Sequence, residues 1–381
     1  MRVFYYVQHL LGIGHVFRAL RIARALVEAN ANVDFVLGGA PPSGEDLSGL
    51  DLVRLPVIRS GSGGFSDLVQ ENGRPVDPAF KTARRDTLLA EFRRARPDVV
   101  LIEAFPFGRR QMRFELLPLL EAARTAEPKP VVVCSIRDIL QENRKPERDT
   151  ETLTLLADAF DHVIVHGDRR FVRLDETFPR VADIVPPVTY SGYVAPKLGS
   201  GPAGSAYGVI VSAGGGAVGR ALIEAALHAK PHTALAKARW LCLTGQNMPQ
   251  EDSAKLVRLA AAQDVELAGF RANLVGALAQ ARLSVSQAGY NTVADILVAG
   301  CAAVLVPFAA QGETEQTHRA RRLERSRTAV AVEEATLTPA ILAAAIDRAS
   351  TLPRERPAID LDGAQRTAAI LRSLCPQDAG P

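Results

Sequence analysis

One histidine stands at a position where acid–base chemistry is possible. The first apolar stretch, Val3–Val7, predicts a buried strand, and a helical pattern runs from Val16 to Ala29. Between them lies the turn Gly12-Ile13-Gly14-His15, whose glycines permit a sharp bend and the close approach of a ligand. His15 therefore starts a helix at the carboxyl end of the first strand, where ligands bind in open α/β sheets. A lone histidine is more often structural, but this position favours a general base.

Two charged residues are expected near this histidine. Glu103 directly follows the apolar stretch Val99–Ile102, so its side chain should reach the same edge of the sheet. It is a candidate partner for His15, or a second acid–base group. Arg18 falls in the first turn of the helix, where a cation opposes the helix dipole unless an anion is held nearby.

A stretch in the second half of the chain has the pattern of a site that binds a phosphate or a sugar. The apolar run Leu283–Val285 predicts a strand, followed by the small-residue turn Ser286–Gly289 and a helix from Asn291 to Val298, capped by Asn291 or Thr292. Such a turn exposes backbone N–H groups that suit a phosphate or a sugar hydroxyl. Asp295, expected in the first helical turn, could accept hydrogen bonds from a ribose. The alternative is that it only complements the helix dipole.

Three consecutive glycines give a third candidate. Gly214, Gly215 and Gly216 separate a predicted strand, Gly208–Ser212, from a predicted helix, Val218–Ala229. A glycine-rich turn between a strand and a helix is typical of a loop that cradles phosphate. The Gly-x-x-x-x-Gly-Lys-Ser/Thr pattern of Walker loops is absent from this sequence.

Apolar runs alternate with amphipathic helices along both halves, which predicts α/β domains with parallel sheets covered on both faces. The 381 residues suggest two domains. The expected boundaries are a first domain over 1–190, a linker rich in Pro, Gly and Ser over 191–206, and a second domain over 207–358. A last helix within 359–375 could cross back onto the first domain.

Composition narrows the class of protein. The net charge of +3 is too small to indicate nucleic-acid binding. The four cysteines form no Cys-x-x-Cys pair and three adjoin apolar runs, which predicts buried reduced thiols in a cytoplasmic protein. No metal-ligand cluster appears among the seven histidines. We expect no signal peptide, and no apolar stretch reaches the roughly 20 residues that span a bilayer.

Two arginine clusters in the first half allow two interpretations. They follow a loop that we expect over 60–78, rich in Gly, Ser and Pro, and the segment Glu103–Phe107. With nearby aromatic residues they could hold an anionic acceptor or touch an anionic membrane surface; alternatively they are solvated helix faces. The residues concerned are Arg84, Arg85, Arg93, Arg94 and Arg96, then Arg109, Arg110 and Arg113, with Phe105, Phe107 and Phe114.

The second half resembles the C-terminal domain of GT-B-fold glycosyltransferases, especially family 28. The matching positions are Ser286, Gly289, Thr292, Asp295, Gly300, Val304–Pro307 and the pair Glu315-Gln316. The family usually carries a glutamate where this chain has Asp295. The Gly-x-Gly-His-x-x-Arg loop resembles the first loop of the same family. It is still more similar to that of a nucleotide-sugar hydrolase of pseudaminic acid synthesis, and the matching histidine lies in the active site of both groups.

This resemblance implies a GT-B fold, with two Rossmann-like domains facing a cleft, and an inverting, metal-independent enzyme without an organic cofactor. Gly214–Gly216 would take the pyrophosphate of a UDP-sugar, Phe270 and Arg271 the base, and Asp295 the ribose. Glu315 and Gln316 would hold hydroxyls of the sugar. The acceptor would be a glycan or a lipid-linked molecule, and the enzyme would be cytoplasmic with peripheral contact at the inner face of the membrane.

Three alternatives stay open. A nucleotide-sugar hydrolase would use water as acceptor, and the first loop favours it. A nucleotide-sugar 2-epimerase would need more acid–base residues than the sequence places. A non-catalytic nucleotide-sugar-binding protein would bind the donor without turnover, and the presence of His15 argues against it.

Overall fold

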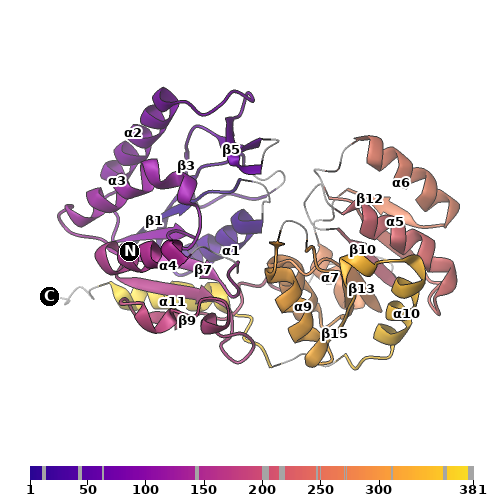
Figure 1. Ribbon diagram of the computed structural model, residues 1–381. Helices are drawn as coiled ribbons and strands as arrows, with labels where there is room; N and C mark the ends of the chain where they lie inside the picture. Colours follow the sequence, from indigo (N-terminus) through magenta and orange to yellow (C-terminus); the bar gives the residue numbers. More distant parts are fainter. Residues whose placement is uncertain are drawn as a thin grey trace. The chain divides into compact units, whose positions relative to one another are not determined.

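The chain folds into two compact units (Figure 1). Unit 1 comprises residues 1–140, 144–194 and 360–381, and unit 2 comprises residues 141–143 and 195–359. The computed structural model describes residues 1–10, 14–41, 45–61, 64–141, 146–199, 206–213, 219–245, 248, 250–269, 271, 273–309, 312–354 and 358–375.

Unit 1 is built on a parallel sheet with strand order β3-β2-β1-β6-β7-β8-β9. Short runs of Val, Ile, Leu and Phe form these strands, as expected for a sheet that is buried on both faces. β1 pairs with both β2 and β6, so the strand order reverses between β1 and β6. The strands are β1 (Arg2–Val7), β2 (Asn32–Leu37), β3 (Asp51–Arg54), β6 (Val99–Glu103), β7 (Val131–Arg137), β8 (His162–His166) and β9 (Val188–Tyr190).

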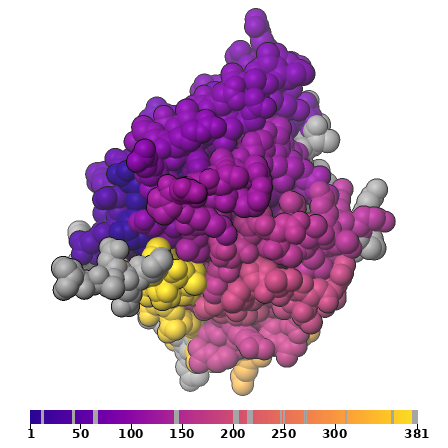
Figure 2. Space-filling view, turned by 90° about the vertical axis from the view of Figure 1, so that its left-hand side faces the viewer, coloured from indigo at the N-terminus to yellow at the C-terminus, as the bar shows by residue number. Residues whose placement is uncertain are grey.

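Helices cover both faces of this sheet. α2 (Pro78–Ala95), α3 (Arg113–Arg124) and α4 (Pro146–Ala159) bury Leu88, Leu119 and Leu156 against Phe4 and Tyr6 of β1 in one core. On the other side, α1 (Gly14–Glu28) packs against α11 (Gly363–Leu374), and α11 is visible in yellow on the surface of unit 1 in Figure 2. The C-terminal helix therefore belongs to unit 1.

The segment before α2 is more regular than the sequence suggested. We expected an open loop over 60–78, but β4 (Ile58–Gly61) and β5 (Gly64–Gln70) form an antiparallel hairpin there. The expectation was wrong for the first part of this range, because residues 64–70 pair with residues 58–61 as a second strand. α2 then begins as predicted by its residues, with the Asp77 carboxylate accepting a hydrogen bond from Phe80 N at 2.8 Å and Pro78 in the first turn.

Unit 2 repeats the plan with strand order β12-β11-β10-β13-β14-β15, again all parallel, and the order reverses between β10 and β13. The strands are β10 (Val209–Ser212), β11 (Trp240–Leu243), β12 (Glu266–Ala268), β13 (Leu283–Ser286), β14 (Ala302–Leu305) and β15 (Ala329–Ala331). The helices are α5 (Arg220–Ala229), α6 (Gln250–Ala262), α7 (Leu274–Gln280), α8 (Tyr290–Ala299), α9 (Glu315–Arg325) and α10 (Pro339–Ser350).

The chain leaves unit 1 later than the expected linker start. Ser191–Val194 are buried in unit 1, and the returning segment is tied to them, with Tyr193 N donating to Asp360 O at 2.8 Å and Gly363 N donating to Tyr193 O at 2.9 Å. Short 3-10 turns lie at Arg110–Met112, Leu174–Glu176, Val181–Asp183, Lys230–His232 and Glu334–Thr336.

The cysteines carry free thiols in the structure: Cys134, Cys242 and Cys301 are buried and Cys375 is half-buried. None of the helices that the structure describes combines the length and apolar character needed to span a bilayer.

Candidate active site

His15 and Glu103 meet at the carboxyl edge of the unit 1 sheet. His15 is the second residue of α1, and Glu103 is the last residue of β6, next to the point where the strand order reverses. The His15 Nδ1 atom lies 3.0 Å from Glu103 Oε1. Glu103 is fully buried, whereas 19% of the His15 side chain is exposed. The fold thus joins a buried carboxylate to an imidazole that solvent can reach.

Arg18 supplies the positive charge that lets Glu103 stay ionised. Its guanidinium is buried and forms an ion pair with Glu103, so the anion expected beside Arg18 is a residue of the protein itself. Burial alone would raise the pKa of Glu103, but Arg18 and the hydrogen bond from His15 lower that pKa below its usual range.

The Glu103 carboxylate is also saturated with donors. Besides His15 and Arg18 on Oε1, its Oε2 atom accepts from Ser135 Oγ at 2.8 Å and from Tyr5 OH at 3.4 Å. A carboxylate offers about four acceptor positions, so these four donors fill it. Glu103 is therefore placed to orient His15, and its filled carboxylate favours the role of partner over that of a second acid–base group.

The ionised carboxylate sets the proton arrangement of His15. Arg18 Nη2 also lies 3.1 Å from His15 Nδ1, but it donates to Glu103 Oε1, which only accepts. We therefore assign the Nδ1–H tautomer, in which His15 donates to Glu103 and Nε2 is left as the basic nitrogen. Burial, and then the nearby Arg109 guanidinium, lower the pKa of His15 to about 3. The imidazole is therefore neutral at pH 7, as a general base must be.

One arginine of the first cluster, Arg84, lies inside the protein and not on a solvated helix face. Arg84 is fully buried, with Nε 2.6 Å from Glu115 Oε2, and its other donors go to the same carboxylate, to Gln8 Oε1 and to the carbonyls of Gly38 and Pro56. The charge of Arg84 is thus used inside the protein.

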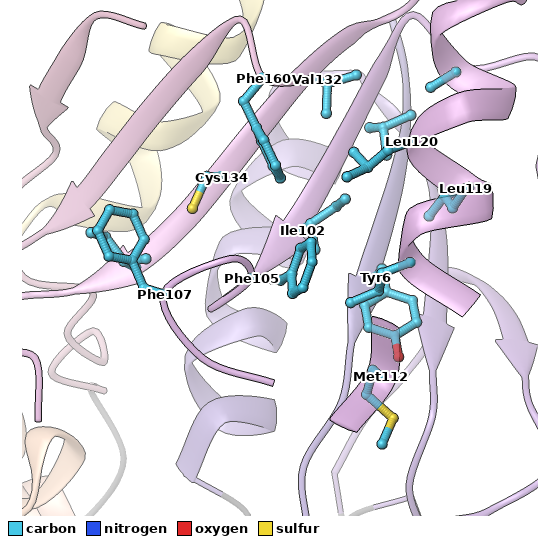
Figure 3. Packing of buried hydrophobic residues seen from close by; sticks show 14 of the residues in the cluster. Tyr6, Ile102, Phe105, Phe107, Met112, Leu119, Leu120, Val132, Cys134 and Phe160 are labelled. Atoms are coloured by element: carbon cyan, nitrogen blue, oxygen red, sulfur yellow. The ribbon is translucent and has the colours of Figure 1, made fainter. Parts of the chain in front are cut away.

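The aromatic residues beside the second cluster do not form a surface. Phe105 and Phe107 are buried in the core of unit 1, where Figure 3 shows them among Ile102, Cys134 and Met112, and Phe114 packs against the same core. The interpretation that aromatic residues flank a basic membrane-contacting surface was wrong for these positions, because the segment after β6 turns inward.

The second cluster itself divides in two. Arg110 and Arg113 both pair with Glu151 of α4. Arg109 instead extends toward the catalytic edge, where its Nε donates to Gln8 O at 2.8 Å, directly after β1. Its charge lowers the pKa of both His9 and His15. Of the cluster, Arg109 is therefore the residue placed to meet an anionic group near His15.

In unit 2, the predicted donor-binding residues lie at or after the carboxyl ends of four strands of the one parallel sheet. Arg271 comes after β12, Ser286–Gly289 after β13, and Glu315-Gln316 after β14. Gly214, Gly215 and Gly216, which come after β10, lie outside the described residues, as do Phe270 and, in unit 1, Gly12. Gly14 is the first residue of α1.

The helix after the Ser286–Gly289 turn starts one residue earlier than predicted. α8 begins at Tyr290 with Gly289 as its N-cap and has no side-chain cap, so the expected cap from Asn291 or Thr292 is not formed. Asp295 consequently lies in the second helical turn and not in the first, where it is half-buried. No side chain among the described residues caps α8, and the positive end of its dipole favours an anion at this position.

Helix α9 holds this turn in place. Gln316 Oε1 accepts hydrogen bonds from Ala288 N at 3.0 Å and from Phe308 N at 3.1 Å. Arg319 is fully buried and donates to Ala288 O at 2.8 Å, and Glu315 pairs with Arg319 at 2.7 Å. The acceptor oxygen of Gln316 is thus engaged in the protein and the Glu315 carboxylate holds Arg319, whereas the Gln316 Nε2 amide could donate to a sugar hydroxyl.

Arg271 has an aromatic partner. Its guanidinium lies 5.4 Å from the ring centroid of Tyr207, and its Nη1 donates to Tyr207 OH at 3.4 Å. Tyr207 OH in turn donates to Glu266 Oε2 at 2.8 Å. This fixes the side chain of Arg271 away from the sheet edge, so a base contact at this position would use its backbone.

Several residues of these networks were missed in the sequence. Tyr5, Ser135 and His166 each interrupt or end an apolar strand, and a polar residue in such a run is the signal that could have found them. Arg319 was noticed only as one of several arginines in its helix. Its buried guanidinium is satisfied by the carboxylate of Glu315, four residues earlier, and by the carbonyl of Ala288, which is distant in the sequence.

Comparisons with known proteins follow the same division of the chain. Residues 209–364 match the glycosyltransferase family 28 C-terminal domain. Two curated relatives are UDP-N-acetylglucosamine--N-acetylmuramyl-(pentapeptide) pyrophosphoryl-undecaprenol N-acetylglucosamine transferases. That of Synechococcus elongatus is 30% identical over 177 residues, which cover 42% of this chain and 47% of the relative. That of Phenylobacterium zucineum is 31% identical over 142 residues, which cover 37% of each protein. The matches therefore span less than half the length of these relatives.

Solved structures resemble the chain over nearly its whole length. MurG of Acinetobacter baumannii has a TM-score of 0.60 at 18% identity, covering 98% of this chain and 99% of that one. The calicheamicin glycosyltransferase CalG4 has a TM-score of 0.59 at 17% identity, covering 97% and 94%. The predicted resemblance is confirmed: residues 209–364 match the glycosyltransferase family 28 C-terminal domain, and the chain has the GT-B fold of these solved glycosyltransferases.

Proposed function

We propose that the protein is an inverting, metal-independent glycosyltransferase that moves a sugar from a UDP-sugar to an acceptor hydroxyl. The observation that carries this proposal is the neutral His15 imidazole, 3.0 Å from the buried, ionised Glu103 carboxylate. This pairing leaves Nε2 free to take a proton, which is what a hydroxyl nucleophile requires.

In the proposed reaction, His15 Nε2 accepts the proton of the acceptor hydroxyl as its oxygen attacks the anomeric carbon. The bond from that carbon to the UDP oxygen breaks on the opposite face, so the configuration inverts. Glu103 stabilises the imidazolium that forms, as the carboxylate of a catalytic triad does. The charge that develops on the pyrophosphate would be stabilised by backbone N–H groups at Gly214–Gly216 and at the start of α8.

The donor would bind to unit 2 through residues that the family resemblance assigns. Asp295 would contact the ribose, Phe270 and the backbone of Arg271 the base, and Gln316 Nε2 a sugar hydroxyl. Glu315 would act indirectly, since its carboxylate holds Arg319. The Asp-x-Asp pattern of the sequence, Asp360-Leu361-Asp362, belongs to unit 1 and gives no support to a metal-bound donor, because Asp360 pairs with Arg366 of α11 at 2.8 Å.

The acceptor is proposed to carry an anionic group and to be lipid-linked. Arg109, held near His15 by its bond to Gln8 O, supports the anionic group. The names of the curated relatives, which specify UDP-N-acetylglucosamine and a pyrophosphoryl-undecaprenol acceptor, support the donor and the lipid. A lipid-linked acceptor would bring the enzyme into peripheral contact with an anionic membrane.

The test is UDP release from a panel of UDP-sugars by the purified protein, in buffer alone and with a bacterial lipid extract. Release that requires the extract, with the labelled sugar recovered on a lipid, is the expected result. Rapid release in buffer alone would make the protein a hydrolase. UDP-sugar binding without release under either condition would make it a binding protein.

A further inference from the structure

A row of buried polar groups continues from Glu103 away from His15. Ser135 Oγ, on the neighbouring strand β7, donates to Glu103 Oε2 at 2.8 Å and also lies 2.8 Å from His166 Nε2 on β8. His166 Nδ1 lies 2.9 Å from Ser191 Oγ, just after β9. All four side chains are fully buried. The row therefore crosses four adjacent strands of the sheet without meeting solvent.

This row has two self-consistent arrangements of its protons. In the first, Ser135 donates to Glu103, His166 donates from Nε2–H to Ser135, and Ser191 donates to His166 Nδ1. In the second, Ser135 donates to His166 Nε2, His166 donates from Nδ1–H to Ser191, and Ser191 donates to Gly192 O, 3.0 Å away. Each serine has one hydroxyl proton and a neutral imidazole has one N–H, so the two arrangements exclude each other.

The charge of Glu103 decides between these arrangements. The first gives a fourth donor to an ionised, buried carboxylate, and the second gives a donor to a neutral carbonyl. A hydrogen bond to an ionised group is roughly twice as strong as one between neutral groups. The first arrangement is therefore favoured as long as Glu103 is ionised, which Arg18 ensures.

We propose that Ser135 and His166 are positioning residues for His15. His166 holds the Ser135 hydroxyl so that its proton points to Glu103, and this hydrogen bond limits how strongly the carboxylate attracts the proton of His15. Without this donor, the negative charge on Glu103 would be less stabilised and would hold an imidazolium more tightly. The pKa of His15 would then rise, and the acid limb of the pH profile for turnover would move to higher pH. The inference rests on the proposed role of His15 as the base.

The charged groups around His15 are accounted for in this argument. Arg18 comes from α1 itself, Glu103 from β6 and Arg109 from the segment after β6. The same Arg18 and Glu103 act on His166. Removing the Ser135 hydroxyl changes none of these charges, so a change in the titration of His15 would report the hydrogen bond alone.

The experiment is ¹⁵N NMR of the histidine side chains in the full-length protein, combined with steady-state kinetics. In the parent protein, His15 is expected as the Nδ1–H tautomer and His166 as the Nε2–H tautomer. Ser135→Ala is expected to raise the His15 titration midpoint and to move the acid limb of the pH profile of kcat upward by the same amount, with KM for the UDP-sugar unchanged. An Nδ1–H tautomer of His166 in the parent protein would overturn the proposal.

Two substitutions of His166 make the test specific. The side-chain amide of a glutamine can take the place of Nε2–H toward Ser135, whereas the shorter asparagine cannot reach it. His166→Gln should therefore keep the His15 midpoint and most of kcat, and His166→Asn should behave like Ser135→Ala. Ser284→Ala is the matched control, since Ser284 is a buried strand serine whose hydroxyl has no partner among the described residues.

The outcomes separate this inference from the proposed function. If Ser135→Ala and His166→Asn lower the unfolding free energy but leave the His15 midpoint and the pH profile of kcat unchanged, the row is only structural and the inference fails. If turnover survives His15→Ala, the proposed base is wrong whatever the NMR spectra show. The NMR measurement needs no substrate, so a wrong choice of acceptor does not affect it.

Discussion

Two adjacent tyrosines of β1 begin two buried ion-pair networks on opposite faces of one sheet, and only one network ends at a histidine. Tyr6 OH donates to Glu115, which pairs with Arg84. Tyr5 OH donates to Glu103, which pairs with Arg18. Each network thus consists of a tyrosine, a glutamate and an arginine. The two networks lie on opposite faces because successive side chains of a strand point to opposite faces of the sheet.

The two networks differ in their exposure to solvent. We call a network closed when its charged groups are paired inside the protein and none of its members is exposed. All five N–H donors of Arg84 are used, on Glu115, Gln8 and two backbone carbonyls, and both Arg84 and Glu115 are fully buried. The Glu103 network instead includes His15, of which 19% is exposed. A closed network can only hold elements together, whereas one that ends at a reachable imidazole can move a proton.

The largest expected effect is on turnover and comes from Glu103→Gln. The amide cannot stabilise an imidazolium, and its NH₂ group opposes the Nδ1–H tautomer of His15. We expect kcat to fall by about 10²–10⁴, the range that general acid–base catalysis supplies. Steady-state kinetics and calorimetric UDP binding check this; an unchanged kcat would remove the distinction between the two networks.

The matched substitution in the closed network is Glu115→Gln. It leaves Arg84 buried without a full counter-charge, and breaking a buried ion pair costs about 3–5 kcal/mol. Urea denaturation should show this loss, while kcat per folded molecule stays near that of the parent protein. If kcat instead falls as far as in Glu103→Gln, the closed network also takes part in catalysis.

Acid should destabilise the protein through its buried neutral histidines. Burial, followed by the Arg18 charge, lowers the pKa of His166 to about 3, against about 6.5 in an unfolded chain. The unfolded state therefore binds more protons between these values, so stability should fall as the pH drops from about 6.5 toward about 3.

His166→Gln should remove this part of the pH dependence, whereas the exposed His228→Gln should leave it unchanged. Urea midpoints measured at several pH values for both variants are the check. Parallel curves for the parent protein and His166→Gln would mean that His166 is not held neutral.

The smallest effect is expected in unit 2, where Gln316 serves both the turn and the donor. Gln316→Glu keeps the acceptor oxygens for Ala288 N and Phe308 N but loses the Nε2 donor. It should raise KM for the UDP-sugar about tenfold, the worth of one hydrogen bond, and leave UDP affinity unchanged. Gln316→Ala should weaken both. Equal effects of the two variants on UDP affinity would contradict the direct sugar contact.

The regular part of the fold could be read from the sequence because it follows local patterns. The apolar runs Val3–Val7 and Leu283–Val285 gave strands within a residue of β1 and β13, and the turns before His15 and after Ser286 led into helices. The hairpin of β4 and β5 was missed, since its strands carry Gly, Ser and Arg in place of an apolar alternation.

From the sequence, site residues could be predicted only where they lie at the ends of strands. His15 and Glu103 were paired correctly because parallel strands share one carboxyl edge. Arg84 was misjudged because its partner Glu115 is 31 residues away in another helix. The row beyond Glu103 was missed for the same reason: a buried serine or histidine shows its role only once its neighbours from other strands are known.

The most direct test of the account is His15→Ala, with turnover and nucleotide affinity measured on the same sample. His228→Ala serves as the control, because His228 is exposed on α5. We predict that His15→Ala loses at least about a hundredfold in kcat, while its dissociation constant for UDP stays equal to that of the parent protein. Turnover that survives, or a loss that appears as weaker UDP binding, would contradict the assignment of proton transfer to His15.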